Sequence, residues 1–492
     1  MSKPTSAQRP ARTYRITTAA HQAPLVDALL AAQGFTSESE PFFPMARRLT
    51  SEPFPLGASL AASFGLIYIQ DRSSMLPPVL LAQGEGGLLG ARCLDMCASP
   101  GGKTGILAQA AGPQGFVLAV EPSRDRLATL RQNLRRMNAL NTATTGVESQ
   151  HLPLPAECFD RILLDPPCSG WGTVDKNPKV MELWTPEKAE TLVRLQRALL
   201  AKAAELLAPG GVLMFSTCTT NVRENEEQAA WALANLPLRL SPLPAPQGFT
   251  PVAPALAGVE GVLRVGEQNT DAEESGEGGQ GQGFFLARFI KHGQPEQAPR
   301  HFAAAELGGR LLSPEELALA GLPSLDTLPP GEVREFGGKA FFLHRHALEL
   351  GLGADTGEGT LRWQGFPLGQ TTGGKEHGGK EVGGRETGGK KPGGKNLRPG
   401  KGGKDREPER GRPSAARLKL DPRLRALLPP AHALAPEQRL DVDDTAPLLD
   451  LLAGRSLGAP REASGGPTGL YFQGLPLGWL TRKGARLLWS DR

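Results

Sequence analysis

The stretch RCLDMCASPGGKT, residues 92–104, decides the fold, because it joins an apolar strand to a glycine-rich loop. Its first half predicts a strand covered on both faces, and the loop predicts a helix start whose amides face a ligand. Similar apolar runs that end in a polar residue predict three more strands at 115–121, 160–165 and 212–217. Strands of this kind, alternating with helices, indicate an α/β domain with an open parallel sheet.

One helix between the last two strands is plain from its pattern. Thr185 suits the cap and Pro186 the first helical position. Apolar side chains recur on one face, and Pro209-Gly210-Gly211 predicts the end; the apolar positions are Leu192, Leu195, Leu199 and Leu206.

Bulk features exclude several classes of protein. No run of about 18 apolar residues is present, and the first residues lack an apolar signal core, so we expect a cytoplasmic protein and no membrane partner. Five cysteines are too few and odd in number for a disulfide framework. They also lack a second pair at ligand spacing, so we expect no metal.

A Gly-Gly-basic repeat divides the second half of the chain. Residues 371–417 hold 13 Lys/Arg and 6 Asp/Glu and almost nothing apolar, which predicts disorder. The segment could hold RNA phosphates electrostatically or be only a solvated spacer. The predicted organisation is an N-terminal domain, an α/β domain, a module, the basic insertion and a last module; their bounds are 1–75, 76–292, 293–369, 370–416 and 417–492.

The loop after the first strand predicts a cofactor site. Its glycines let a ligand approach the backbone, but it lacks the spacing of a P-loop or a dinucleotide fingerprint. Such a loop suits the methionine part of S-adenosylmethionine, and Glu121 at the next strand end suits the ribose hydroxyls. The loop residues are Cys97, Ala98, Ser99, Pro100, Gly101, Gly102 and Lys103.

Asp165, Cys168 and Cys218 follow the last two strands, where carboxyl ends of parallel strands meet. A thiolate that adds to carbon 6 of cytosine makes carbon 5 nucleophilic enough to take a methyl group. Asp165 could hydrogen-bond ring nitrogen 3, and the second cysteine could assist release. Cys93 and Cys158 lie inside apolar runs and are interpreted as core residues.

With these residues in place, 66–291 resembles the Sun-family RNA 5-methylcytosine methyltransferases. The resemblance rests on the cofactor loop, on Asp165 to Gly170, on Ser216 to Thr219 and on the acidic stretch that begins at Asn225. It implies a Rossmann-like class I methyltransferase sheet, a small N-terminal α+β domain and β-rich, PUA-like C-terminal modules. It also implies S-adenosylmethionine as cofactor, RNA as partner, Cys218 as nucleophile, and Asp165 beside both cofactor and base.

Two departures from the family stand out. Glu148 stands where the family has an Asp that contacts the adenine side of the cofactor, so Glu148 is the candidate for that contact. Residues 264–282 read as a polar run without the family's Arg-x-x-Pro-His stretch. The tail 470–479 is similar to that of RsmF-type members, which implies 16S ribosomal RNA as the target. We also expect a monomer.

Three alternatives stay open. Cys168 could be the nucleophile, as in DNA cytosine-5 methyltransferases, which use a Pro-Cys of this kind. The target could be a transfer RNA. The chain could also be an RNA-binding ribosome-assembly factor with reduced catalysis.

Overall fold

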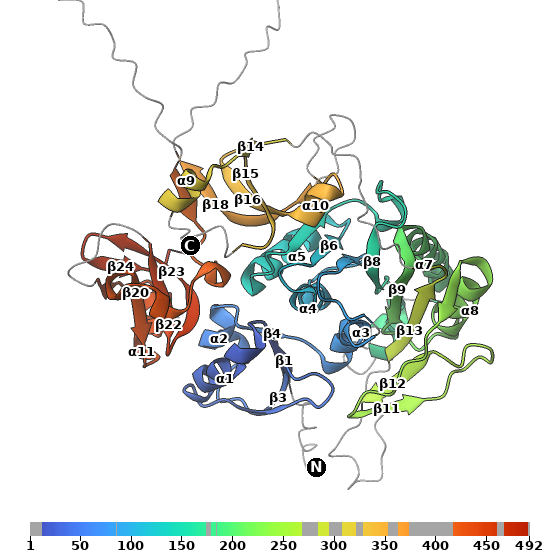
Figure 1. Ribbon diagram of the computed structural model, residues 1–492. Helices are drawn as coiled ribbons and strands as arrows, with labels where there is room; N and C mark the ends of the chain where they lie inside the picture. The colour runs from blue at the N-terminus through green and yellow to red at the C-terminus, as the bar shows by residue number, and fades with distance from the viewer. Residues whose placement is uncertain are drawn as a thin grey trace, which may run out of the picture.

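The computed structural model describes residues 12–84, 86–173, 179–183, 185–267, 284–294, 308–320, 328–352, 363–372, 417–459 and 467–490. These residues form four sheets, which pack together with their helices into one body (Figure 1). Within these ranges, no helix has the length and apolar character that crossing a bilayer requires.

The central sheet has the strand order β11-β12-β13-β9-β8-β5-β6-β7-β17. Its middle, β7-β6-β5-β8-β9, is parallel, and β13 runs antiparallel beside β9. The four strands predicted from the sequence are β5, β6, β8 and β9, which confirms the α/β class. The bounds are β5 Arg92–Asp95, β6 Phe116–Val120, β7 Thr142–Thr145, β8 Phe159–Leu164, β9 Leu207–Thr217, β10 Leu238–Leu240, β11 Phe249–Val252, β12 Leu263–Glu267, β13 Phe284–Lys291 and β17 Trp363–Gln364.

Helices cover both faces of this sheet, as continuous apolar strands require. On one face lie α3 (Arg72–Ala82), α4 (Gly102–Ala111) and α5 (Arg124–Met137), whose apolar side chains share one buried cluster with the sheet. On the other lie α7 (Pro186–Leu206), α8 (Glu226–Asn235) and α10 (Arg345–Glu349).

Helix α7 begins as predicted, with the Thr185 hydroxyl accepting the Lys188 N–H at 3.4 Å. Its end differs from the expectation, because α7 stops at Leu206 and β9 starts directly at Leu207. Pro209-Gly210-Gly211 therefore lies inside the strand. Gly210 has φ +70°, and the register with β8 shifts nearby, so the glycines serve a bulge and do not end the helix.

The N-terminal domain has a four-stranded sheet, β2-β3-β1-β4, and two helices. Its core continues into the last module, so the two ends of the chain share one apolar cluster. The rings of Phe64 and Trp489 pack edge to face across this junction, with their centroids 5.2 Å apart. Figure 1 shows the two parts side by side. The bounds are β1 Thr13–Ile16, α1 Ala23–Ala31, β2 Thr36–Ser39, β3 Ala46–Ser51, α2 Leu60–Ser63, β4 Ile67–Ile69, β20 Arg439–Val442, α11 Ala446–Leu452, β21 Leu457–Gly458, β22 Thr468–Phe472, β23 Leu475–Lys483 and β24 Arg486–Leu488.

The remaining sheet has the order β14-β15-β16-β18-β19. Strand β19 pairs with β18, although more than forty residues of the basic insertion, 373–416, separate them and lie outside the described residues. Residues 417–420 thus belong to this sheet and not to the last module, where we had placed them. The bounds are β14 Arg310–Leu311, α9 Pro314–Leu319, β15 Gly331–Phe336, β16 Lys339–His344, β18 Phe366–Thr372 and β19 Arg417–Leu420.

Candidate active site

The site lies where the strand order of the central sheet reverses. From β5 the chain continues outward through β6 and β7, and it then returns to β8 on the other side of β5. Open α/β sheets bind their ligands at such a point, beyond the carboxyl ends of the strands. The loops that follow β5, β6, β8 and β9 carry most of the residues predicted for the site.

The two predicted cysteines lie in contact. Their sulfur atoms are 3.4 Å apart, and both side chains are partly buried. The hydrogen bond from Cys168 lowers the pKa of Cys218, and nearby Lys103 adds to this, against the opposing effects of burial and Asp165. The same hydrogen bond, together with burial, raises the pKa of Cys168 well above its usual range. Of the two thiols, Cys218 is therefore the one that loses its proton more easily.

Asp165 is fixed by two partners on neighbouring elements. Lys103 Nζ lies 2.7 Å from one carboxylate oxygen, and the Ser216 hydroxyl donates to the other at 2.7 Å. Burial alone would lower the pKa of Lys103, but Asp165 and Asp95 together raise it, so the lysine is a cation. Lys103 thus reaches from the cofactor loop toward the cysteines, a position that its place in the sequence did not reveal.

The cofactor loop is held close to the backbone of its neighbours. Gly101 has φ +104°, which favours glycine, and a Cβ at Gly102 would lie 2.9 Å from Tyr68 and 3.0 Å from Gln70. The Asn133 side chain donates to the Pro100 carbonyl at 2.8 Å. The loop therefore forms a tight cradle at the start of α4, with no room for larger side chains at Gly102.

Two carboxylates border this cradle. Glu121 is 2% exposed; it accepts the Ser123 N–H at 2.9 Å and lies 3.3 Å from Arg126. Asp95 is fully buried, and burial raises its pKa to about 6. One Asp95 oxygen accepts the Thr104 hydroxyl, while the other has no partner among the described residues. A glycine cradle, a buried carboxylate oxygen without a partner among the described residues, and a carboxylate at the next strand end fit the chemistry of S-adenosylmethionine.

Two further predicted residues lie at the edge of the site. Burial and three carboxylates raise the pKa of Cys97 well above its usual range, so Cys97 stays a thiol. The Glu148 side chain is 61% exposed and points to its own short helix, 3.0 Å from the Gln150 amide and 3.8 Å from His151. Its neighbour Ser149 donates to the Met96 carbonyl, so the backbone at 148–149 lies beside the cofactor loop.

Gln196 and Glu224, two buried polar side chains behind the cysteines, were not predicted for the site, and Asn225 and Glu226 were named only as part of the family resemblance. Glu224, Asn225 and Glu226 are each fully buried, directly after the nucleophile motif. One signal was available, because Gln196 interrupts the apolar face of α7 and is also fully buried. An amide in such a stripe needs a polar partner, and it donates to Glu224.

The segment 264–282, predicted to be a polar run, begins within a strand. Residues 263–267 form strand β12, which pairs with β13, while 268–283 lie outside the described residues. Arg264 makes a double ion pair with buried Glu226 and approaches the Thr220 carbonyl. An arginine is thus present at the start of this run, and its packing against Glu226 could not be predicted from the polar composition of the run.

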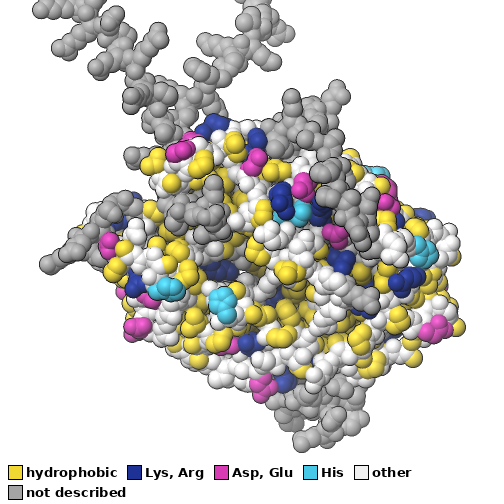
Figure 2. Space-filling model, in the orientation of Figure 1, with side chains coloured by type: hydrophobic (Ala, Val, Ile, Leu, Met, Phe, Trp, Pro, Cys, Tyr) yellow, Lys and Arg dark blue, Asp and Glu magenta, His cyan; other side chains and the backbone are white. Residues whose placement is uncertain are grey.

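The five cysteines are free thiols. In the part of the chain that the structure describes, no three His, Cys, Asp or Glu side chains are grouped to hold a metal ion. On the face shown in Figure 2, the described lysines and arginines lie in small, separate groups.

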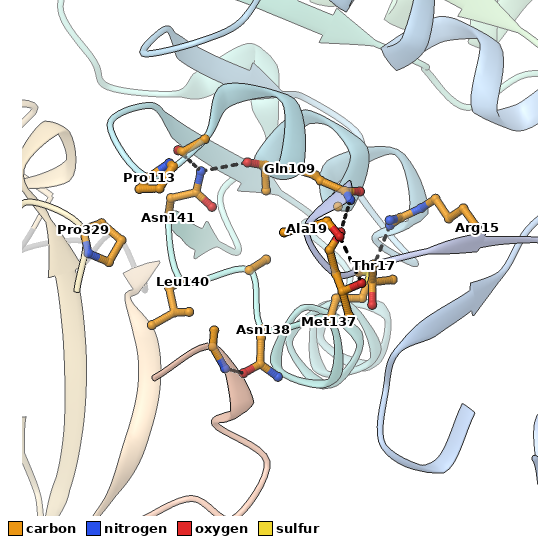
Figure 3. A pocket seen from close by; sticks show the side chains of 16 residues that line it. Arg15, Thr17, Ala19, Gln109, Pro113, Met137, Asn138, Leu140, Asn141 and Pro329 are labelled. Atoms are coloured by element: carbon orange, nitrogen blue, oxygen red, sulfur yellow. Dashed lines mark hydrogen bonds between the residues drawn. The ribbon is translucent and has the colours of Figure 1, made fainter. Parts of the chain in front are cut away.

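A cavity of about 280 Å³ lies elsewhere, where three parts of the chain meet (Figure 3). One face of α4 lines it through Gly105, Ala108 and Gln109, opposite residues near Asn138 and the N-terminal Arg15. None of the predicted site residues lines it. The cavity therefore has no part in the chemistry considered below.

Known proteins similar to this chain are methyltransferases. Residues 87–252 match the family described as 16S rRNA methyltransferase RsmB/F. Ribosomal RNA small subunit methyltransferase F of Cronobacter sakazakii is 36% identical over 299 residues, 59% of this chain and 59% of that protein. The protein of the same name from Salmonella agona is 40% identical over 242 residues, 49% of this chain and 48% of that protein.

The chain thus spans only about half to three fifths of the length of these curated relatives. A solved structure, described as a methyltransferase homolog protein from Pyrococcus horikoshii, is 32% identical. It has a TM-score of 0.48, and the match covers 58% of this chain and 87% of that one. The matched residues 87–252 include strands β5 to β9 and both cysteine loops, so this domain is similar to the family of 16S rRNA methyltransferases RsmB/F.

Proposed function

We propose that the protein transfers a methyl group from S-adenosylmethionine to carbon 5 of a cytosine in 16S ribosomal RNA. The observation that carries this proposal is the thiol pair, 3.4 Å apart, in which hydrogen bonding lowers the pKa of Cys218 and raises that of Cys168. The choice of 16S ribosomal RNA rests on the names of the relatives.

The cofactor would lie over the glycine cradle. The backbone of 97–102 would hold its methionine part, Glu121 would accept the ribose hydroxyls, and Glu148 is the candidate for the adenine side. When bound, S-adenosylmethionine supplies an electrophilic methyl group. The protein holds the loop that would bind the cofactor, because Asn133 donates to the Pro100 carbonyl and Tyr68 lies against Gly102.

Cys218 starts the reaction by adding its thiolate to carbon 6 of the cytosine. The added electron pair makes carbon 5 nucleophilic. Ring nitrogen 3 takes up a proton from solvent, and the Asp165 carboxylate is placed to accept the resulting N–H. Lys103 balances the Asp165 charge, and Ser216 fixes its orientation. After methyl transfer a solvent water takes the carbon 5 proton, the bond between Cys218 and carbon 6 breaks with its electron pair returning to sulfur, and nitrogen 3 gives its proton back to solvent.

Cys168 is placed to help that last step. Its sulfur lies 3.4 Å from the Cys218 sulfur, so a Cys168 S–H that donates to Cys218 would stabilise the departing thiolate. The two pKa directions disfavour the reverse assignment, in which Cys168 attacks, because Cys168 holds its proton more tightly. The target base must be unpaired or flipped, since thiol and methyl reach it from its faces.

Trapping with 5-fluorocytidine RNA tests the proposal, because fluorine at carbon 5 blocks release. We expect wild-type protein to form a stable adduct, Cys218→Ala to form none, and Cys168→Ala to accumulate adduct even on unmodified RNA. Adduct formation by Cys218→Ala, or none by Cys168→Ala, would assign the attack to Cys168.

The two other candidates have separate readouts. Equal adduct formation on a transfer RNA and on a 16S fragment would remove the 16S preference. A calorimetric titration without any S-adenosylmethionine binding would favour an RNA-binding assembly factor.

A further inference from the structure

We propose that Gln196, Glu224 and Asn225 form a buried bracket that positions the two cysteines, an inference that rests on the function proposed above. All three side chains are fully buried, and none of them reaches the cysteine sulfurs directly. They come from α7, from the short helix Val222–Glu224 and from the cap of α8. They are positioning residues, because they hold the loops that carry the thiols.

Asn225 holds the Cys218 loop on both sides of the cysteine. The Thr217 hydroxyl donates to its side-chain oxygen, and its side-chain nitrogen donates to the Thr219 carbonyl at 2.8 Å. The residues before and after Cys218 are thereby tied to one rigid amide. Rotation of the Cys218 backbone away from Cys168 would break both hydrogen bonds.

Glu224 and Gln196 hold the Cys168 loop in the same manner. Glu224 accepts the Ser169 N–H at 2.9 Å and the Gln196 amide at 3.1 Å, and Gln196 also donates to the Pro167 carbonyl at 3.0 Å. The residues on either side of Cys168 are therefore fixed by one carboxylate and one amide. Because Glu224 and Asn225 are adjacent in the chain, the two halves of the bracket cannot move independently.

Two direct contacts join the loops themselves. The hydroxyls of Ser169 and Thr219 lie 2.7 Å apart, and the Gly172 N–H donates to the Cys218 carbonyl at 3.1 Å. Both contacts need the register that the bracket imposes. The 3.4 Å sulfur contact, on which the opposite pKa directions depend, lies at the end of this network.

A purely structural role would not need a carboxylate here. Burying a charge is costly unless hydrogen bonds offset the lost hydration. The partners of Glu224 among the described residues are uncharged donors: the Ser169 N–H and the Gln196 and Asn221 amides. An apolar side chain would pack at lower cost, whereas the carboxylate can collect donors from both the Cys168 loop and α7.

The test compares Asn225→Ala and Glu224→Ala with Gln228→Ala in the full chain. Gln228 is a matched control, because it is a fully buried amide in α8, the helix that Asn225 caps, and it donates to the Arg223 carbonyl and not to a cysteine loop. Two readouts are measured. One is the pH dependence of Cys218 alkylation by iodoacetamide without RNA, and the other is adduct formation on 5-fluorocytidine RNA.

We expect Asn225→Ala to slow adduct formation by about 100-fold, because a shift of about 1 Å at a reacting group costs that much. The KM for RNA should change little, since the bracket does not face the substrate. The alkylation profile of Cys218 should move to higher pH, because the bond from Cys168 is weakened. Glu224→Gln, which keeps an acceptor for the Ser169 N–H, should lose less than Glu224→Ala.

Binding of S-adenosylmethionine by calorimetry shows that each variant is folded. Should Asn225→Ala fail this check, Thr217→Val removes part of the same contact from the other side. If wild-type protein forms the adduct and Asn225→Ala gives the same alkylation profile and adduct rate as Gln228→Ala, the bracket is overturned. A wild-type protein without adduct overturns the proposed function, and the alkylation profiles then still decide the bracket.

Discussion

The double ion pair between Glu226 and Arg264 gives the sharpest stability prediction. The Glu226 side chain is 0% exposed and that of Arg264 15%, with contacts at 2.5 and 2.6 Å, and Glu226 also accepts the Ala255 N–H at 3.0 Å. In Arg264→Met the carboxylate stays buried with only that N–H. Removing one partner of a buried pair costs about 3–5 kcal/mol. At about 2–4 °C per kcal/mol for a domain of this size, the melting temperature should fall by roughly 6–20 °C.

The pH dependence of this loss has a definite sign. Burial raises the pKa of Glu226, but Arg264 and the Ala255 N–H outweigh it and hold the pKa below its ordinary value of 4.5. The ion pair therefore stabilises the fold fully above that value, and its contribution fades as the pH falls further. In Arg264→Met only backbone N–H groups still oppose the effect of burial, so we expect Glu226 to take up a proton more readily and the penalty to disappear at low pH. The difference between wild type and variant should be largest near pH 7 and shrink toward pH 4.

Thermal unfolding followed by circular dichroism between pH 4 and pH 8 measures this difference. The matched control is Arg223→Met, since Arg223 pairs with Glu190 at the surface, where such a pair contributes about 0–1 kcal/mol. Arg264→Met that melts within 2 °C of Arg223→Met, or a difference that grows toward pH 4, would refute the reasoning.

Three further outcomes follow from the site and its surroundings. Glu121→Ala should weaken S-adenosylmethionine binding by about 10- to 100-fold, because hydrogen bonds to a charged group contribute about 1.5–3 kcal/mol; calorimetry that finds an unchanged affinity would remove Glu121 from the site. At pH 7.5 iodoacetamide should modify Cys218 before Cys97 and Cys168, because only Cys218 has a lowered pKa; peptide mass mapping that finds equal rates would contradict this. Burial lowers the pKa of His344, which lies 3.1 Å from the Pro113 carbonyl, to about 4. Because burial disfavours the charged imidazolium, the stability of a fold with buried, neutral His344 is complete above pH 6.5 and is lost as the pH falls toward about 4. His344→Gln should therefore flatten the acid limb of the melting curve, and an unaltered limb would argue against it.

The parallel sheet and the catalytic candidates could be predicted because each corresponds to a recognisable pattern in a short stretch of sequence. An apolar run that ends in a carboxylate or a cysteine predicts both a strand and its place at the sheet edge, as at Asp165 and Cys218. The order of strands then brought these ends together. The ion pair of Lys103 with Asp165 could not be predicted, since it depends on how α4 lies against the next strand.

Contacts between parts of the chain that are far apart in the sequence could not be predicted from any short stretch of it. Arg425 is nearly fully buried and donates to carbonyls at Phe64 and Met137, which ties the last module to both the N-terminal domain and α5. Nothing near Arg425 in the sequence indicates those partners. The same holds for Arg264, which was predicted to lie in a polar run, and for β19, whose partner strand lies on the other side of the basic insertion.

The most direct test of the central claim is methyl transfer itself. Small-subunit particles that lack the modification are incubated with S-adenosylmethionine and either wild-type protein or Cys218→Ala, and their 16S RNA is then sequenced after bisulfite treatment. We predict a new 5-methylcytosine with wild-type protein and none with Cys218→Ala. A 5-methylcytosine made by Cys218→Ala, or a methyl group placed by wild type on any atom other than carbon 5, would contradict the claim.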